Sequence, residues 1–322
     1  NVDSLNLHRF MPHDSIFGLS ATIHAEGEGM DFFSPRTRAM LKTEVSHFRY
    51  GSLVFSGVTL TAGLQRSQAS ALLNINNRAL DVSAELQALL HPNLVKADLN
   101  TSIRLLDWQE LALMNTPFRS SMNIEVHAQT DMKQRHSART TISGIQLATA
   151  ERTFKTKDLH AGFNMAPDSV RGYVNAGDLT FLFRTANSLE KFMNKTDRIA
   201  QEFSAQWKKK HINQQLLKEI MPTAQLKIFS GSDNPVANFL AAQHISYNRL
   251  RANFSMSPEK GLDGSIDLFG LHTDSLQLDT IYFRASQDSA RLQFNSGVKA
   301  LASKRQEAFN ISLPFVSSTQ AT

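Results

Sequence analysis

The sequence predicts a mainly β protein, an elongated antiparallel sheet curled into an open U-shaped groove, or β-taco, with one amphipathic helical insert. Apolar and polar residues alternate with a period of two along most of the chain, clearly so in 159–165 and 250–256. Around residues 188–220 the apolar period becomes that of a helix. The chain also has 21 Phe but two Trp and four Tyr, and Phe suits a surface that is apolar throughout.

The first region, residues 1–186, is expected to consist of repeated strands of this groove. Short alternating segments separated by polar turns run from about residue 5 to residue 183, for example at 81–86, 99–105, 122–128 and 179–183. Because successive side chains of a strand point to opposite faces, each segment would have one apolar and one polar face. The apolar face needs a cover, which could be a second protein layer or an apolar ligand.

The second region, 187–221, is predicted to be an amphipathic helical insert. Ser188 can cap a helix of about five turns, Asn213 can begin a shorter one, and Pro222 ends it. Two interpretations are open: the long helix lies on the apolar face of the sheet as a lid, or it binds a membrane surface or a partner through Trp207 and the lysines at 208–210. The apolar stripe that would form the lid comprises Leu189, Phe192, Met193, Ile199, Phe203 and Trp207.

The third region, 222–322, returns to period two and is expected to continue the same sheet. At 229–240 a strand should lead into a short helix, capped by Asp233 or Asn234 and with Pro235 in its first turn. A weak internal repeat, Leu-x-Ala-x-Phe-x-Met-x-Pro, occurs at 159–167 and again at 250–258. The repeat suggests a sheet extended by similar units.

Alternation combined with large apolar side chains also nominates a groove wall, although the same residues could fill a closed core. The nominated wall residues are Phe163, Met165, Phe181, Phe183, Phe254, Met256, Leu268, Leu278, Leu292 and Phe294.

The sequence provides little from which to build a catalytic or metal site. The chain has no Cys, which excludes disulfides, thiolate metal sites and cysteine nucleophiles. It contains no GxSxG elbow, phosphate-binding glycine loop, HExxH motif or acidic calcium loop. The closest histidine pair, His8 and His13, would point to opposite faces of a strand. Glu26 and Glu28 could form a carboxylate pair, but Glu-Gly-Glu-Gly is equally typical of a polar turn. No enzyme activity, catalytic residue, metal or cofactor is therefore expected.

Net charge and the lengths of the apolar runs exclude two further classes, nucleic-acid-binding proteins and chains with a membrane span. The net charge of +5 is spread over 322 residues, and no basic patch is interleaved with aromatic residues, so nucleic acid is not an expected partner. No run approaches the 18 apolar residues that a membrane span would need. The sequence opens with Asn1, and we expect a processed protein or a piece of a longer one.

The order of motifs in residues 150–315 resembles the periplasmic region of TamB-like translocation and assembly proteins of diderm bacteria. The resemblance rests on the long amphipathic helix, the strand ending at Gly231, the Asp-Asn-Pro joint at 233–235 with Leu240, and the Pro-Glu-Lys-Gly-Leu turn at 258–262. Asp-Thr-Ile at 279–281 and Gln-Asp at 287–288 complete the order. The resemblance implies membership of the AsmA-like superfamily, whose architecture is related to bridge-like lipid transfer proteins. This chain would be an interior periplasmic fragment of a protein anchored in the inner membrane.

The expected function follows from that resemblance together with the apolar groove. The fragment would bind phospholipid acyl chains, conduct phospholipid between the inner and outer membranes, and support outer-membrane biogenesis, with an outer-membrane barrel protein as partner of the full-length chain. An alternative is a chaperone-like scaffold that assists outer-membrane β-barrel assembly by strand augmentation. A third alternative is a structural sandwich with a sealed core. Co-purifying phospholipid would favour the first of these.

Overall fold

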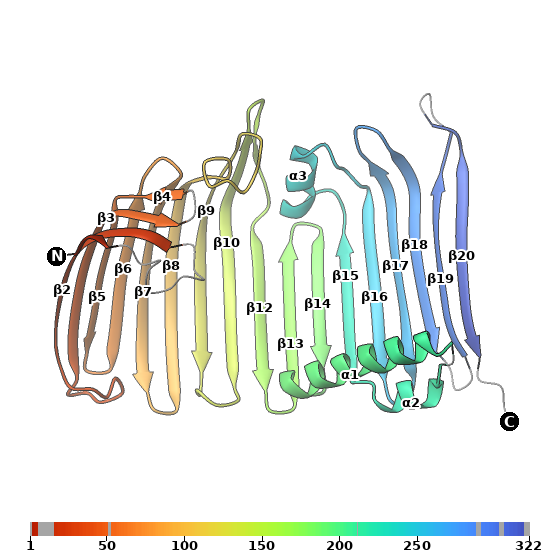
Figure 1. The fold of residues 1–322 in the computed structure, drawn as a ribbon, viewed down its shortest axis with the longest axis horizontal. Coiled ribbons are helices and arrows are strands. Elements are labelled where there is room, and N and C mark those ends of the chain that lie inside the picture. Colours follow the sequence, from red (N-terminus) through yellow and green to blue (C-terminus); the bar gives the residue numbers. More distant parts are fainter. Residues whose placement is uncertain are drawn as a thin grey trace. The chain divides into compact units, whose positions relative to one another are not determined.

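The computed structural model describes residues 2–5, 16–50, 53–210, 212–287, 291–302 and 306–318. Contacts between residues divide the chain into two compact units, Asn1–Asp158 and Leu159–Thr322. Each unit is mainly β, with antiparallel strands in an open sheet, and the second also carries the helices (Figure 1). The predicted class, an open antiparallel β-groove with a helical insert, is confirmed.

The first unit is a series of antiparallel strands in which most strands pair with the next one along the chain. Pairing runs from β1 to β2 and β3, from β3 to both β4 and β5, and then successively from β5 to β11. The strands are β1 (Val2–Leu5), β2 (Ile16–Glu28), β3 (Arg38–Tyr50), β4 (Leu53–Phe55), β5 (Val58–Gln65), β6 (Gln68–Asn76), β7 (Leu80–His91), β8 (Leu94–Asp107), β9 (Phe118–Thr130), β10 (His136–Thr149) and β11 (Thr153–Lys155).

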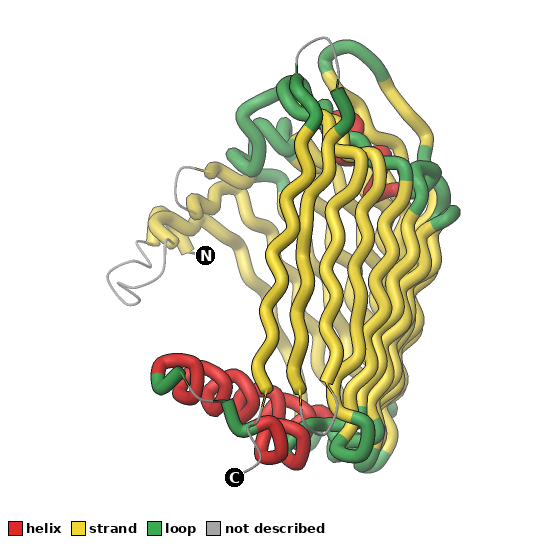
Figure 2. Tube along the Cα trace, turned by 90° about the vertical axis from the view of Figure 1, so that its right-hand side faces the viewer, coloured by secondary structure: helices red, strands yellow, loops and turns green. Residues whose placement is uncertain are grey.

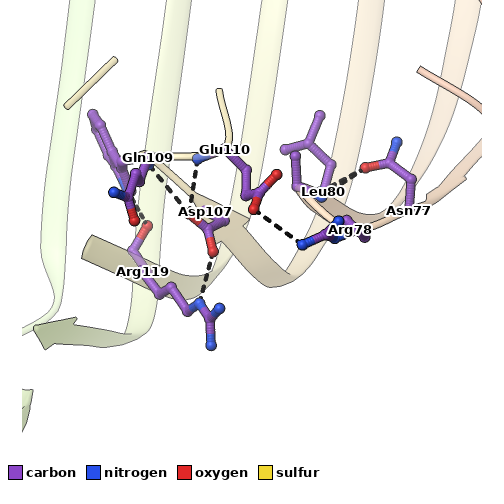
Figure 3. Close-up of polar contacts among 10 residues, drawn as sticks. Asn77, Arg78, Leu80, Asp107, Gln109, Glu110 and Arg119 are labelled. Atoms are coloured by element: carbon purple, nitrogen blue, oxygen red, sulfur yellow. Dashed lines mark hydrogen bonds and ion pairs between the residues drawn. The ribbon is translucent and has the colours of Figure 1, made fainter. Parts of the chain in front are cut away.

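The loop between β8 and β9 is held by a buried carboxylate (Figure 3). Asp107 accepts backbone N–H bonds from Gln109 and Glu110, and Arg119 donates to it from Nε at 2.7 Å. Burial by itself would raise the pKa of Asp107, but these hydrogen bonds and the Arg119 charge outweigh burial and lower the pKa. Beside this carboxylate, Trp108 packs edge-on against the fully buried Phe118 at a centroid distance of 5.8 Å.

The second unit is a meander in which each strand pairs antiparallel with the next, from β12 to β20. No pairing among the described residues joins β12 to β20, so this sheet is open as well. The strands are β12 (Leu159–Ala166), β13 (Ser169–Ala176), β14 (Leu179–Thr185), β15 (Ala224–Ser230), β16 (Arg249–Ser257), β17 (Gly261–His272), β18 (Gln277–Gln287), β19 (Arg291–Ala300) and β20 (Phe309–Ser318).

Three helices interrupt the strands of the second unit. Between β14 and β15 lie α1 (Leu189–Lys208), which Ser188 caps through a bond from the Lys191 N–H, and α2 (Gln214–Glu219), which Asn213 caps. Between β15 and β16 lies α3 (Pro235–Ala242), capped by Asn234. These starting points are the predicted ones, because a side-chain oxygen at the cap satisfies a backbone N–H that has no partner within the helix.

The helical insert does not break the sheet. Thr185, the last residue of β14, pairs directly with Ala224, the first residue of β15. The insert is therefore the connection of a β-hairpin, and contacts place it inside the second unit. The boundary between the two compact units follows Asp158, and the division into 1–186, 187–221 and 222–322 stays a prediction.

Candidate functional site

The apolar face of the second unit consists of rows of paired residues that cross the sheet perpendicular to its strands. Paired residues of antiparallel strands share a face, so following the pairing from β12 to β20 traces each row. The central row is Phe163, Gly172, Phe183, Leu226, Phe254, Gly264, Ala285, Phe294 and Phe315. A second row is Ala161, Val174, Phe181, Ile228, Ala252, Ile266, Phe283, Ser296 and Leu313. We call this surface, with the two rows that flank it, the apolar face.

The internal repeat of the sequence falls on the apolar face in matching positions. Phe163 of β12 and Phe254 of β16 lie in the central row, while Met165 and Met256 lie together in the row on one side of it. Each repeat phenylalanine is paired with a glycine of the following strand, and the Phe254 ring lies over Gly264 so closely that a Cβ there would meet the ring at 2.1 Å. The repeated sequence therefore builds the same piece of the face twice.

Nine of the ten nominated wall residues lie on the apolar face. Phe163, Phe183, Phe254 and Phe294 are in the central row, Phe181 is in the second row, and Leu268 lies beyond it, paired with Leu250 and Ile281. Met165, Met256 and Leu292 belong to the opposite flanking row.

Leu278 is the exception. It is three residues from Ile281 and five from Phe283, so strand alternation puts it on the other face of β18, where it is 8% exposed.

The opposite face of the same strands is polar. Arg284 of β18 forms an ion pair with Asp267 of β17, and Tyr282 donates a hydrogen bond to Ser312 of β20 at 3.1 Å. The Arg251 guanidinium lies 5.8 Å from the ring centroid of Phe229. The second unit thus has one face that water solvates readily and one that it does not.

Helix α1 lies across one end of the apolar face. Its side chains contact three strands through ring pairs: Phe192 with Phe183 of β14 at 5.2 Å, Phe203 with Phe294 of β19 at 6.4 Å, and Trp207 with Phe315 of β20 at 5.1 Å. A helix of 20 residues is about 30 Å long, and strands spaced about 4.8 Å apart make β14 to β19 about 24 Å wide. Figure 1 shows α1 crossing the strands near their lower ends, and Figure 2 shows α1 and α2 on one side of the sheet.

Polar contacts and a small core hold the two helices in this position. Ile212, Leu217 and Ile220 are buried and pack with Ile199 and Phe203 of α1. The buried Gln206 of α1 accepts the Asn213 N–H at 2.7 Å. Gln287, the last residue of β18, is buried, and its side-chain amide donates a hydrogen bond to the backbone oxygen of Gln214 at 3.1 Å.

Three residues of the predicted lid stripe remain accessible to solvent, including Trp207, which contacts the sheet through one ring pair. Leu189, Met193 and Trp207 are 37%, 54% and 52% exposed, respectively. On the face itself, Phe163 is 45% exposed, and Ile311 and Leu313 of β20 are 51% and 66% exposed. Most other residues of the central and second rows are half-buried, and few are fully buried. A sealed core would bury them, so within the described residues this is an uncovered apolar surface.

The first unit also has a continuous apolar face, built from smaller side chains. One of its rows is Ala25, Leu41, Ala62, Ala71, Leu86, Leu99, Val126 and Thr140, and the next is Ile23, Thr43, Leu60, Leu73, Ala84, Thr101, Ile124 and Ile142. Phe32, which is 62% exposed, lines a hollow on this face together with Leu41 and Leu86. Phenylalanine is therefore concentrated on the face of the second unit.

The described residues contain no cluster of three or more His, Asp or Glu that could hold a metal ion. Glu26 and Glu28 are both exposed near the end of β2, and Asp233 precedes the cap of α3. His8 and His13 lie outside the described residues.

Sequence reasoning missed Phe283 and Phe315, which connect the aromatic part of the face. Phe294 stacks between them at 5.9 Å from each ring centroid. Both belong to runs of alternating apolar residues, at 281–285 and 311–315, so a signal was present in the sequence. The neighbouring Pro314 is compatible with a strand here, because proline is tolerated chiefly on edge strands and β20 pairs with β19 alone in the part of the chain that the structure describes.

No protein-family model matches this chain, and neither does any curated protein or solved structure. No helix of the described residues is both long and apolar enough to cross a membrane. The function is therefore inferred from the apolar face and from the resemblance seen in the sequence.

Proposed function

We propose that this chain is a periplasmic segment of the cell envelope that binds phospholipid acyl chains on its apolar face and conducts them between the inner and outer membranes. The observation that carries the proposal is the central row, which runs from β12 to β20 without a charged side chain and stays partly exposed. An acyl chain lying on this row would bury apolar surface, and each Å² removed from water would stabilise the complex by about 25 cal/mol.

Continuity of the face supports conduction as well as binding. A ligand that moves along a surface needs similar affinity at each step, and rows of Phe, Leu, Ile, Val and Ala provide similar contacts from strand to strand. No charged group interrupts the central or second row. In the proposed protein the full-length chain is anchored in the inner membrane, cooperates with an outer-membrane barrel, and supports outer-membrane biogenesis.

A matched pair of substitutions tests the proposal. Phe181→Asp places a charge in the second row, whereas Phe229→Asp places the same charge on the polar face of the neighbouring strand β15, because Phe181 pairs with Ile228. Both variants should fold, since each position is reached by water in an open sheet. Phospholipid bound per protein, measured by mass spectrometry, should fall in Phe181→Asp and stay at the wild-type level in Phe229→Asp. Equal lipid contents in the two folded variants would overturn the proposal.

A chaperone-like scaffold for outer-membrane barrels is the second candidate, favoured by one observation. Within the described residues the outer edge of β20 has no pairing partner, and an unpaired edge can add a strand from another chain. Incubation with an unfolded barrel protein, followed by crosslinking from residue 312 or 316, would detect such pairing. Strand-register crosslinks without bound lipid would favour the scaffold over lipid conduction.

A further inference from the structure

A cleft lies between the last turns of α1 and the end of the apolar face. It is an open cleft with a volume of about 580 Å³, within the range of about 300–1,000 Å³ typical of small-molecule sites. Phe203 and Trp207 form the helix side, and Phe283, Phe294 and Phe315 form the sheet side. Phe203 and Phe294 meet edge-on, with their rings 87° apart, so the two sides meet at that point. The slot between them is lined by aromatic rings and is continuous with the central row.

The two flanks of this aromatic slot differ. Each helical residue turns by about 100°, so Glu202 and Gln206 lie on one side of the Phe203–Trp207 stripe, while Ser204 and Lys208 lie on the other. The Gln206 flank is closed, because Gln206 is buried and bonded to the start of α2. The flank with Ser204 and Lys208 lines the cleft and is exposed.

The open flank ends at Lys208, and two further lysines follow it where the helix ends. Lys208, Lys209 and Lys210 are all exposed, and none forms an ion pair with another described residue. A helix C-terminus favours basic residues, which accounts for charge in this turn. It does not account for an aromatic slot that opens beside the charge. Trp207, 52% exposed at the mouth, has the apolar body and polar edge that suit the boundary between acyl chain and headgroup.

We propose that this cleft is a loading site for anionic phospholipid, with an acyl chain between the aromatic walls and the headgroup phosphate beside the lysines at 208–210. The inference rests on the proposed lipid-binding function and adds to it a place on the molecule and a headgroup preference. The acyl chain would enter beside Trp207 and reach the central row at Phe294. A lipid with net negative charge gains attraction to three cations that a zwitterionic lipid of equal chain length largely lacks.

The test is a competition between two lipids in the full chain. Wild-type protein and variants are equilibrated with equal amounts of short-chain phosphatidylglycerol and phosphatidylcholine below their micelle concentrations, and bound species are counted by native mass spectrometry. Phosphatidylglycerol should be favoured about tenfold. This is the preference expected if the lysines attract the headgroup about as strongly as one basic residue is attracted to an anionic membrane surface. Lys208→Gln/Lys209→Gln/Lys210→Gln should reduce the ratio to near one without abolishing phosphatidylcholine binding.

A control variant removes the same charge elsewhere. Lys191→Gln/Arg198→Gln/Lys227→Gln neutralises one exposed cation in the first turn of α1, one in the middle of that helix and one on the polar face of β15. It should keep the wild-type ratio. A local readout comes from a Trp108→Phe background, in which Trp207 is the remaining tryptophan. A phosphatidylglycerol with brominated acyl chains should quench its fluorescence.

The outcomes separate this inference from the proposed function. Equal binding of both lipids by the wild type would overturn the loading site and leave lipid binding intact. Absence of either lipid from the wild type would overturn both. The protein could instead attach to phosphatidylglycerol vesicles while monomeric brominated lipid fails to quench Trp207. That result would overturn the aromatic slot as a lipid site and favour a helix that binds the membrane surface. A loss of preference in the control variant would also contradict it.

Discussion

At the scale of single residues, the apolar face depends on rings that fold over small neighbours. A Cβ added at Gly264 would lie 2.1 Å from Cδ1 of Phe254, whereas one added at Gly172, in the same row, would meet nothing closer than a backbone oxygen at 3.8 Å. Gly264→Ala should therefore turn the Phe254 ring out of place and lower the free energy of unfolding by about 1–3 kcal/mol. Gly172→Ala should change it by less than about 1 kcal/mol. Urea denaturation in the Trp108→Phe background, followed by Trp207 fluorescence, would measure both, and equal losses would contradict the packing described for Phe254.

A second residue-scale prediction contrasts two ion pairs in Figure 3. Asp107 is buried and bonded to Arg119, whereas Arg78 and Glu110 form a 3.4 Å pair with side chains 88% and 45% exposed. Asp107→Ala should cost about 2–4 kcal/mol of unfolding free energy, because it leaves two backbone N–H groups without their acceptor. Glu110→Ala should cost less than about 0.5 kcal/mol. Thermal unfolding in a Trp207→Phe background, followed by Trp108 fluorescence, distinguishes them, and comparable costs would show that Asp107 does not organise this loop.

The contribution of the Asp107 carboxylate to the free energy of unfolding depends on pH. Because the pKa of Asp107 is lower in the folded state than in the unfolded state, its contribution to stability is present above the unfolded value of 3.8. The contribution is lost as pH falls through the lowered pKa. The difference in unfolding free energy between wild type and Asp107→Ala should therefore shrink as the pH is lowered from 5 to 3.

At the scale of elements, the helical insert can be removed without disturbing the strands around it. Thr185 pairs with Ala224 on either side of the insert, so a short Gly-Ser turn in place of residues 187–221 can close the β14–β15 hairpin. Removing α1 uncovers Phe183, Phe294 and Phe315. Binding of an apolar fluorescent dye per molecule should increase while far-ultraviolet circular dichroism retains the β signal. Unchanged dye binding by a folded deletion variant would mean that α1 does not cover the apolar face.

Local features of helices and strands could be predicted from the sequence, whereas their long-range contacts could not. Helix starts were predictable because Ser188, Asn213 and Asn234 provide local capping groups. What Asn234 does beyond its helix was not predictable: its side chain is fully buried and donates to Asp178 at 2.7 Å, 56 residues away in sequence. Alternation likewise predicted that each strand has an apolar face, but a strand's phase relative to its neighbours depends on long-range register. Leu278 was misplaced for this reason, because the phase of Leu276 and Leu278 differs from that of Ile281 and Phe283.

At the scale of the whole molecule, both units have one apolar face, but the two faces differ in chemistry. That of the first unit consists mainly of small and branched aliphatic residues with threonines among them, and that of the second is rich in phenylalanine and partly covered by α1. Aromatic rings contribute more contact area per residue than alanine or valine. We therefore expect acyl chains to be held more tightly by the second unit and to move more freely over the first.

The most direct measurement is photocrosslinking with a phospholipid that carries a diazirine on its acyl chain, followed by mass-spectrometric mapping of the adducts. If the apolar face holds acyl chains, adducts should fall on its row residues, such as Phe181, Phe254 and Phe294, and spare Tyr173 and Tyr282 of the polar face. Adducts divided equally between the two faces, or confined to loops, would contradict lipid binding by the apolar face.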